Sequence, residues 1–419
     1  MTDQNYTIST DAKALVDRPK GWKMTTLGGI ISSGLISNHN NKRYPLAGGE
    51  RLKRQGVYPY YGAASAIDFI DGYKYDGFYL LVAEDGTVYD GKSPMLQLVK
   101  GKFWVSNHSH VLQGKDEIIT KFLSYILKNI NVSPYITGAV QPKLTKENLY
   151  SISFLIPENE MEQRAIAAVL SSLDDKIELL REQNIILEAT AQAIFKEWFV
   201  NFNFPAAACK MIDSELGKIP EGWRVVKLGD VVDIRGGTTP STENQDFWNG
   251  NIAWTSPKDL SNSDGIFLLK TEKKITKDGL KKIGSGLLPV GTLLLSSRAP
   301  IGYLAITNIE VAINQGYIAF LPDKYLSNQF MFLWLKLNMN TVIGSANGST
   351  FLEISKSSFR NINCMVPENI ILEKFSNLIN PLFKKMLNNS LQIQTLSSLR
   401  DALLPKLMKG AIRVRGFND

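Results

Sequence analysis

Apolar residues recur at alternating steps of four and three between residues 157 and 200, counted from Ile166. A heptad pattern of this kind predicts one long helix whose narrow apolar stripe packs against a second helix. Asn159, followed three residues later by Glu162, provides a capping box for the start of this helix. The stripe consists of Leu170, Leu173, Ile177, Leu180, Asn184, Leu187, Ala191, Ile194 and Trp198.

A second stripe lies between residues 367 and 408 and opens with the same Pro-Glu-Asn triplet as the first. By count, residues 157–200 have 4 Lys or Arg and 9 Asp or Glu, whereas residues 367–419 have 8 and 4. Because the net charges are opposite, we expect the two helices to pair within one chain. The second stripe consists of Leu372, Phe375, Ile379, Leu382, Met386, Asn389, Ile393, Leu396, Arg400, Leu403 and Leu407.

Three residues modify this picture of two paired helices. Asn184 and Asn389 each lie near the middle of a stripe. A single core Asn often determines the register of a coiled coil, but it can equally be a polar residue tolerated where the helices diverge. Pro381 lies inside the second helix and predicts a kink or an interruption there.

The chain repeats itself once. The sequence Gly-Trp-Lys at 21–23 returns as Gly-Trp-Arg at 222–224, and from Gly138 onward the two copies match at a steady offset of 210, as for Gly348. Two globular modules, each followed by a long helix, are therefore the predicted organisation. The predicted parts are an N-terminal arm with the first module at 1–156, a helix at 157–200, a hinge at 201–219, the second module at 220–366, and a helix with a C-terminal tail at 367–419.

Inside the modules the pattern favours short strands over helices. Brief apolar or β-branched runs, such as 78–83 and 317–321, lie between Gly, Asn and Asp residues. Helical patterns are confined to 119–128 and 328–337. We therefore expect an α+β fold in which two β-rich modules alternate with two long helices.

Composition places this chain among globular proteins with a weak preference for polyanions. Its 419 residues are 44% hydrophobic and carry a net charge of +7, with a pI near 9.0. Two distant cysteines, Cys209 and Cys364, and the lack of a signal sequence predict a reduced, cytoplasmic protein without disulfides. No apolar stretch is long enough to predict a membrane span.

Two short motifs indicate chemistry that their context does not support. Residues 86–93 match the phosphate-loop pattern GxxxxGKS, but a phosphate loop leads into a helix, whereas Pro94 and a strand-like segment follow here. His108 and His110 could share one face of a strand, yet nearby cysteines are lacking, so a metal site is not expected. Acidic residues such as Glu84 and Asp85 do not form a recognisable catalytic group. The sequence therefore predicts a non-catalytic protein that binds neither metal nor cofactor.

What remains is a set of candidate nucleic-acid contacts, because Lys and Arg suit phosphates whereas polar and aromatic side chains suit bases. Lysine runs can also be solvated faces, and the YPYYG segment at 58–62 can equally be a packing corner. The candidates in the first module are Lys42, Arg43, Lys53, Arg54, Tyr60 and Tyr61. Those in the second module are Arg235, Thr238, Thr239, Lys258 and Arg298.

Several motifs resemble those of the specificity (S, HsdS) subunits of type I restriction-modification systems. They are the GW and LG openings, PYYGA at 59–63, RGGTTP at 235–240, SSRAPIG at 296–302 and, above all, the 157–177 segment PENEMEQRAIAAVLSSLDDKI. The resemblance covers nearly the whole chain. It implies two target-recognition domains that each recognise one half of a bipartite, asymmetric DNA site. It also implies that the helices pair antiparallel as a spacer between the half-sites.

The same resemblance implies the partners. The spacer helices would dock two modification subunits, which bind S-adenosylmethionine and methylate adenine. Restriction subunits would use ATP and Mg²⁺ to translocate and cut double-stranded DNA, so the chemistry would belong to other chains. Two alternatives remain open: a coiled-coil adaptor that binds only proteins, and a nucleotide-binding enzyme that uses residues 86–93.

Overall fold

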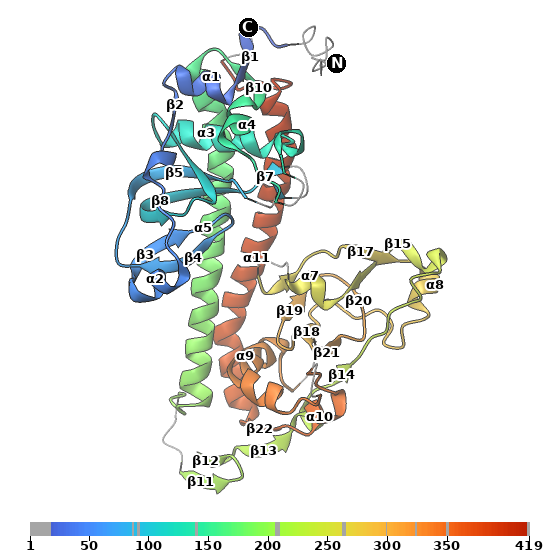
Figure 1. Ribbon diagram of the computed structural model, residues 1–419. Coiled ribbons are helices and arrows are strands. Elements are labelled where there is room, and N and C mark those ends of the chain that lie inside the picture. The colour runs from blue at the N-terminus through green and yellow to red at the C-terminus, as the bar shows by residue number, and fades with distance from the viewer. Residues whose placement is uncertain are drawn as a thin grey trace. The chain divides into compact units, whose positions relative to one another are not determined.

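The chain divides into two compact units, Met1–Lys176 with Leu396–Asp419, and Ile177–Thr395. Each unit contains one β-rich module and one part of each long helix (Figure 1), and the predicted α+β fold is confirmed. The computed structural model describes residues 18–85, 88–89 (backbone only), 93–138, 141–205, 210–261, 265–298, 300–322, 325–348 and 352–416.

The first unit is built around a six-stranded sheet in the order β2-β9-β5-β8-β3-β4. All neighbouring strands are antiparallel except β3 and β8, which run parallel. The strands are β2 (Ile36–Asn38), β9 (Ser109–Gly114), β5 (Tyr75–Ala83), β8 (Leu96–Val105), β3 (Gln55–Tyr61) and β4 (Ala66–Ile70). Two further antiparallel pairs are β1 (Trp22–Thr26) with β10 (Ser153–Pro157), and β6 (Val88–Tyr89) with β7 (Ser93–Pro94).

Helix α3 (Glu117–Lys128) covers one face of this sheet, and the hydrophobic core of the unit lies between them. Asp116 caps the helix by accepting a hydrogen bond from the backbone N–H of Ile119 at 3.0 Å. Its apolar face packs on buried sheet residues such as Leu80 and Leu112. The other short helices of this unit are α1 (Leu27–Ser32), η1 (Asn40–Lys42), α2 (Gly48–Lys53), η2 (Ser133–Tyr135) and α4 (Lys146–Ser151).

The second unit contains a five-stranded sheet, a three-stranded sheet and two strand pairs. The five-stranded sheet is β14 (Ile234–Arg235), β21 (Tyr317–Phe320), β18 (Leu293–Ser296), β19 (Leu304–Thr307) and β16 (Phe267–Leu268), in that order. The three-stranded sheet is β17 (Lys273–Ile275), β15 (Trp248–Thr255) and β20 (Ala312–Ile313). The pairs are β11 (Met211–Ser214) with β12 (Gly217–Pro220), and β13 (Arg224–Lys227) with β22 (Asn363–Val366).

Helix α9 (Asn328–Gly344) takes the place of α3 in the second unit and likewise begins at a capping side chain, that of Ser327. Its buried residues pack with the long helices and the five-stranded sheet. The remaining helices are α6 (Leu228–Val231), η3 (Gln245–Phe247), α7 (Pro257–Ser261), α8 (Lys277–Leu280) and α10 (Lys356–Arg360).

Strand pairing confirms the internal repeat. The antiparallel pair β1-β10 of the first unit corresponds to β13-β22 of the second. The order β2-β9-β5-β8 likewise corresponds to β14-β21-β18-β19. The sequence predicted the central strands and the principal helix of each module, α3 and α9, because these are the most apolar segments. It missed the more polar strands β3, β4, β15 and β17.

The two long helices are α5 (Glu160–Phe199) and α11 (Asn369–Met408), and their ends agree closely with the predicted ones. In the first unit the start of α5 packs on the end of α11, with Leu170 beside Leu404 in one buried cluster. In the second unit the end of α5 packs on the start of α11, and the rings of Phe195 and Phe375 lie 5.8 Å apart. Each unit therefore contains an antiparallel helix pair, as expected.

Two details of these helices correct the sequence-based picture. Helix α11 continues through Pro381 without interruption, because the proline ring is exposed and buried neighbours such as Ile379 and Phe383 hold the helix on both sides. Asn159 does accept a hydrogen bond from the N–H of Met161 at 2.9 Å. The carboxylate of Glu162, in contrast, binds Arg413 of the C-terminal tail at 2.6 Å.

The two core asparagines contact each other. The side-chain amide of Asn389 donates to Oδ1 of Asn184 at 3.0 Å, and Nδ2 of Asn184 lies 3.4 Å from the carbonyl oxygen of Met386. Asn389 is fully buried. Since a shift of either helix would leave a buried amide without its partner, this contact favours the register-determining role over the tolerated-residue alternative.

We expect Asn389→Leu to lower the free energy of unfolding by about 1–3 kcal/mol, because Oδ1 of Asn184 loses its donor. Replacing both Asn184 and Asn389 by Leu should recover most of this loss, since neither amide is then left without the other. Urea unfolding of the full chain measures both effects. Asn388→Leu, at an exposed neighbouring position, is the matched control. An equal loss in the single and double variants would contradict the pairing.

Among the described residues, the helices are all too short or too polar to cross a membrane. Cys364 is a buried free thiol whose pKa is raised to about 12 by burial. Cys209 lies outside the described residues.

Candidate nucleic-acid interface

Each unit carries an equivalent two-stranded ribbon, which is the edge of the six-stranded sheet in the first unit and part of the three-stranded sheet in the second. In the first unit β3 pairs antiparallel with β4, and Tyr60 near its end pairs parallel with Trp104 of β8. In the second unit β15 pairs antiparallel with β17, and Trp254 pairs parallel with Ala312 of β20. We call these the first ribbon (β3-β4) and the second ribbon (β15-β17). Their sequences differ, so the equivalence emerges only from the strand pairing.

A glycine at the same point confirms that the two ribbons correspond. A Cβ atom at Gly56 would overlap the backbone carbonyl of Ile70, and one at Gly250 would overlap that of Ile275. The register of the ribbon shifts at each of these glycines. Both ribbons therefore contain a bulge in which only glycine allows the close approach of the two strands.

Cations lie over aromatic rings around the first ribbon. Nζ of Lys74 is 4.9 Å from the ring centre of Trp104, and the guanidinium carbon of Arg54 is 5.1 Å from it. Nζ of Lys102 is 4.7 Å from the ring of Tyr73, and the hydrogen bond to this tyrosine raises the pKa of Lys102. Tyr44 and Tyr73 are 54% and 42% exposed, so aromatic surface is available beside the positive charges. Together these residues form the first aromatic–cation cluster.

The second ribbon carries a smaller cluster of the same kind. Nζ of Lys273 lies 5.5 Å from the ring centre of Trp248, and that of Lys282 lies 5.6 Å from Phe247. Exposed lysines continue along this edge of the unit at Lys274, Lys277 and Lys281. Positive charge interleaved with aromatic rings is the combination that binds nucleic-acid backbones and stacks on bases.

Three of the predicted first-module contacts lie at the surface. Lys42 and Lys53 are exposed. Arg54 belongs to the aromatic–cation cluster and also pairs with Asp71 at 2.8 Å. Lys74 and Lys102 were not among the predicted contacts. The signal for Lys74 was the alternation of tyrosine and lysine in the segment DGYKYDG, residues 71–77.

Two other first-module predictions are corrected by the structure. Tyr60 is only 1% exposed, and its hydroxyl oxygen accepts a hydrogen bond from the N–H of Leu46 at 2.9 Å, so it is a packing corner. Arg43 pairs with Glu84 at 2.5 Å and donates to the carbonyl oxygen of Ser109 at 3.0 Å. The guanidinium group of Arg43 therefore points into the unit, where the ion pair with Glu84 holds it. Half-buried Tyr61 packs edge-on against a neighbouring ring, and burial raises its pKa.

The predicted second-module residues all keep part of their side chains in solvent, and each has a polar partner. The partners are Asp233 for Arg235 at 3.0 Å, the Lys282 carbonyl for Thr238 at 2.9 Å, Gln315 for Thr239 at 2.6 Å, Glu272 for Lys258 at 3.6 Å, and Glu353 for Arg298 at 3.5 Å. The contacts of Thr238 and Lys258 place these two residues beside the second ribbon. Arg235, at the end of β14, and Arg298, after β18, have their partners at other parts of the unit.

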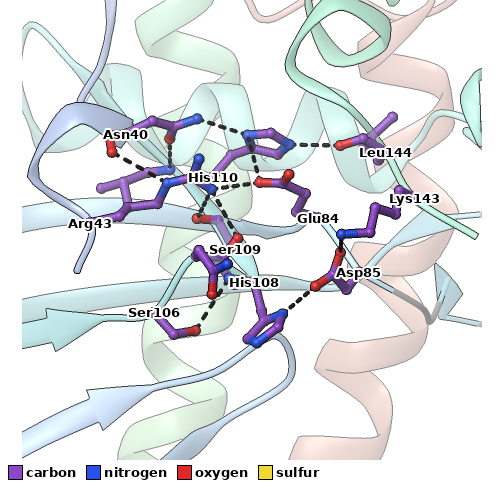
Figure 2. A network of polar contacts seen from close by, with 12 residues as sticks. Asn40, Arg43, Glu84, Asp85, Ser106, His108, Ser109, His110, Lys143 and Leu144 are labelled. Atoms are coloured by element: carbon purple, nitrogen blue, oxygen red, sulfur yellow. Dashed lines mark hydrogen bonds and ion pairs between the residues drawn. The ribbon is translucent and has the colours of Figure 1, made fainter. Parts of the chain in front are cut away.

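A polar network lies where strand β5 ends and strand β9 begins (Figure 2). Arg43 neutralises Glu84, and Asp85 pairs with His108 and, at 2.9 Å, with Lys143. The two histidines point to different places, because His108 lies in a turn before β9 whereas His110 is fully buried. The described part of the chain contains no group of three potential ligands that could hold a metal ion. The network holds loops together and has no free acid or base at its centre.

His110 is neutral in this network. Oδ1 of Asn40 accepts the N–H of Val111 at 2.8 Å, so Nδ2 of Asn40 must donate to Nδ1 of His110, 2.9 Å away. Nε2 of His110 therefore carries the proton and donates to the carbonyl oxygen of Leu144 at 2.7 Å. Burial lowers the pKa of His110, although the hydrogen bond to the Leu144 carbonyl and the nearby Glu84 oppose that shift.

Because the folded-state pKa lies below the ordinary value near 6.5, the stability that neutral His110 contributes is complete above pH 6.5 and falls as the pH drops below it. We expect His110→Gln to flatten the dependence of unfolding free energy on pH between about 7 and 5, by up to about 1.4 kcal/mol per pH unit. Urea unfolding at several pH values measures this slope. Some slope should persist, since burial also lowers the pKa of His39. His108→Gln, at an exposed position, is the control, and an equal change there would contradict the assignment.

The family to which this fold belongs is identified by comparison with known proteins. The pattern of the family described as "Type I restriction modification DNA specificity domain" matches residues 19–189 and again residues 220–392. The chain belongs to this family. Each match lies over one copy of the internal repeat.

Named relatives of this specificity chain agree with that assignment. The type I restriction enzyme MjaIX specificity subunit of Methanocaldococcus jannaschii is 31% identical over 72% of this chain and 71% of its own. The HindI specificity subunit of Haemophilus influenzae is 26% identical over 65% and 71%. A crystal structure of the type I restriction-modification S subunit from M. genitalium superposes with a TM-score of 0.59 at 17% identity, covering 92% of this chain and 96% of that one. It supports the fold.

One ion pair of the specificity chain has exchanged its charges between the repeats. Asp85 bridges to Lys143 in the first unit, and Arg298 bridges to Glu353 at the corresponding place in the second. The backbone hydrogen bond beside each ion pair is the same in both units. In the first unit the N–H of Leu144 donates to the carbonyl oxygen of Glu84, and in the second the N–H of Ile354 donates to the carbonyl oxygen of Ser297. The two recognition domains thus preserve a contact between loops while its residues diverge.

The phosphate-loop match of the specificity chain falls mostly on residues 86–87 and 90–92, which lie outside the described residues. The segments that follow it are the strands β7 and β8. A phosphate loop leads directly into a helix whose N-terminus binds the phosphate. The described context is that of a strand connection, so the nucleotide-binding alternative has no support.

Proposed function

We propose that this chain is the DNA-recognition subunit of a type I restriction-modification complex, and that each unit recognises one half of a bipartite, asymmetric site. The supporting observation is the tandem specificity-domain match, with one equivalent ribbon in each domain and different side chains on the two ribbons. Equivalent position supports a shared role in DNA contact, whereas different residues support two different half-site sequences.

The remaining parts of the complex follow as proposals. Helices α5 and α11 dock two modification subunits and determine the gap between half-sites through their length. Exposed apolar residues on α5, such as Ile185 and Ile186 at 69% and 65% exposure, support docking there. S-adenosylmethionine, ATP and Mg²⁺ would bind to the modification and restriction subunits, so this chain contributes recognition and no catalytic residue.

Methylation mapping by single-molecule sequencing tests the proposed function. Cells expressing this chain with its cognate modification subunit are compared with cells that lack the chain. Methylated adenines in one split, asymmetric motif, lost without this chain, are the expected result. An assembled complex that methylates no such motif would overturn the proposal and favour the coiled-coil adaptor.

The proposed phosphate contacts in the first unit make a prediction about salt. We expect Lys74→Ala with Lys102→Ala to weaken binding of the assembled complex to all duplexes alike. The slope of log affinity against log salt should become shallower by about 1.8, since each lost phosphate contact removes about 0.9. Binding titrations between about 50 and 200 mM salt measure the slope. Lys409→Ala is the matched control, at an exposed position outside the first aromatic–cation cluster. A slope that does not change would remove this cluster from the interface.

A further inference from the structure

The bulge in the second ribbon has an unusual backbone. Trp248 and Ile252 both lie opposite Ile275, so the residues between them are extra in β15. Within this bulge Asn249 has a φ of 59°. Only one other non-glycine residue of the described chain, Phe202, has a positive φ. This backbone is unfavourable for residues other than glycine, although Asn tolerates it best, and bulges commonly redirect a side chain toward a functional site.

Asn249 lines a groove of about 470 Å³. Gln245 and Trp248 line the same groove, and Lys273 and Lys274 form its positive side. The amides of Asn249 and Gln245 are both exposed, and among the described residues neither side chain has a hydrogen-bond partner. The groove therefore offers two unused amides next to an indole ring and two positive charges.

The indole ring that forms one wall is held in place. Nε1 of Trp248 donates to the carbonyl oxygen of Ser241 at 3.0 Å, and Nζ of Lys273 lies 5.5 Å from the ring. The acidic residue of the groove, Glu272, lies 3.6 Å from Nζ of Lys258. The rigid ring can limit how far a base edge enters, and the lysines suit the phosphates that flank that base.

The first ribbon does not offer the same chemistry. Gln55 precedes Gly56, as Asn249 precedes Gly250, so both bulges carry an amide just before their glycine. In the first unit this amide is already used, because Nε2 of Gln55 donates to the carbonyl of Arg51 at 3.0 Å and to Asp68 at 3.1 Å. The free amide is thus a property of the second ribbon.

We propose that Asn249, assisted by Gln245, recognises the edge of one adenine in the half-site bound by the second unit. A side-chain amide presents one donor and one acceptor, which match N7 and the N6 amino group of adenine in the major groove. This inference rests on the proposed function and adds to it a residue, a base and the half-site in which that base lies.

The test uses Asn249→Gly in the full chain, assembled with its modification subunits. Glycine removes the amide and adopts the positive φ without strain, so the bulge is preserved. Binding is measured to duplexes in which each base pair of the wild-type motif is replaced in turn. We expect discrimination to fall about 5- to 150-fold at one A·T pair of the second half-site, and to stay the same elsewhere. Asn251→Ala, an exposed Asn in the same strand, is the matched control.

Each alternative outcome has a defined meaning. Unchanged discrimination, uniform weakening on all duplexes, or loss in the first half-site would overturn the role of Asn249. If the Asn249→Gly variant gives one of these results but the wild-type complex methylates a split motif, only the role of Asn249 is overturned and the proposed function stands. If the wild-type complex recognises no split motif, the proposed function fails with it. Equal unfolding midpoints for the variant and the wild type confirm that the comparison concerns folded protein.

Discussion

Arg413→Ala is expected to lower the free energy of unfolding of the first unit by about 3–5 kcal/mol. The guanidinium group binds both carboxylate oxygens of Glu162, at 2.6 and 2.8 Å, and donates to the carbonyl of Lys20 at 3.3 Å. Glu162 is only 1% exposed. Removing Arg413 therefore leaves a buried carboxylate without its counter-charge, which costs far more than the loss of a surface ion pair.

Urea unfolding measures the stability loss, and hydrogen exchange at the first turn of α5 localises it. Arg415→Ala is the matched control, because Arg415 is exposed two residues further along the same tail. The double variant Glu162→Gln with Arg413→Ala should lose less than Arg413→Ala alone, since no buried charge then needs a partner. A loss below about 1 kcal/mol in Arg413→Ala would show that the tail does not hold the unit together.

Phe375→Ala should destabilise the second unit by about 3–5 kcal/mol. The ring of Phe375 is fully buried, and its centre lies 4.7 Å from that of Phe199, 5.6 Å from Trp198 and 6.1 Å from Phe330. Truncation leaves a cavity among large rings that cannot easily move to fill it, so the loss of packing adds to the loss of apolar burial.

Thermal and urea unfolding of the full chain measure this change. Leu378→Ala is the matched control on the same helix, because Leu378 is 45% exposed, and it should change stability by no more than about 0.5 kcal/mol. Phe375→Leu, which keeps most of the volume, should cost less than the alanine variant. Equal losses in Phe375→Ala and Leu378→Ala would contradict the position of this ring at the centre of the helix packing.

Much of the fold could be predicted because it is encoded by local spacing. Phe375 and Asn389 were assigned to the helix stripe from their place in a heptad alone, and both are fully buried. Pro381 was the exception, since a local rule predicted a kink or an interruption, and the packing of neighbouring residues keeps the helix uninterrupted. Cooperative burial along a long helix outweighs the loss of one backbone hydrogen bond.

The candidate interface was harder to predict, because surface roles depend on partners far away in the sequence. Arg43 was chosen for its charge, but Glu84, 41 residues away, accepts a hydrogen bond from it and holds it inside the unit. Lys102 was overlooked, although Tyr73 on a neighbouring segment places it over an aromatic ring. Charge alone does not tell whether a side chain is paired or available to DNA.

The sequence by itself determined that two β-rich modules alternate with two long helices, because heptad spacing and an internal repeat depend only on the order of residues along the chain. Only the tertiary structure decided which polar residues are free. It showed that the ribbons at β3-β4 and β15-β17 are equivalent although their residues differ. It also showed that the side chain of Asn249 has no hydrogen-bond partner among the described residues, whereas that of Gln55 at the corresponding bulge is bonded. Hydrogen bonds and ion pairs between distant segments are formed only when the chain folds, so no local pattern encodes them.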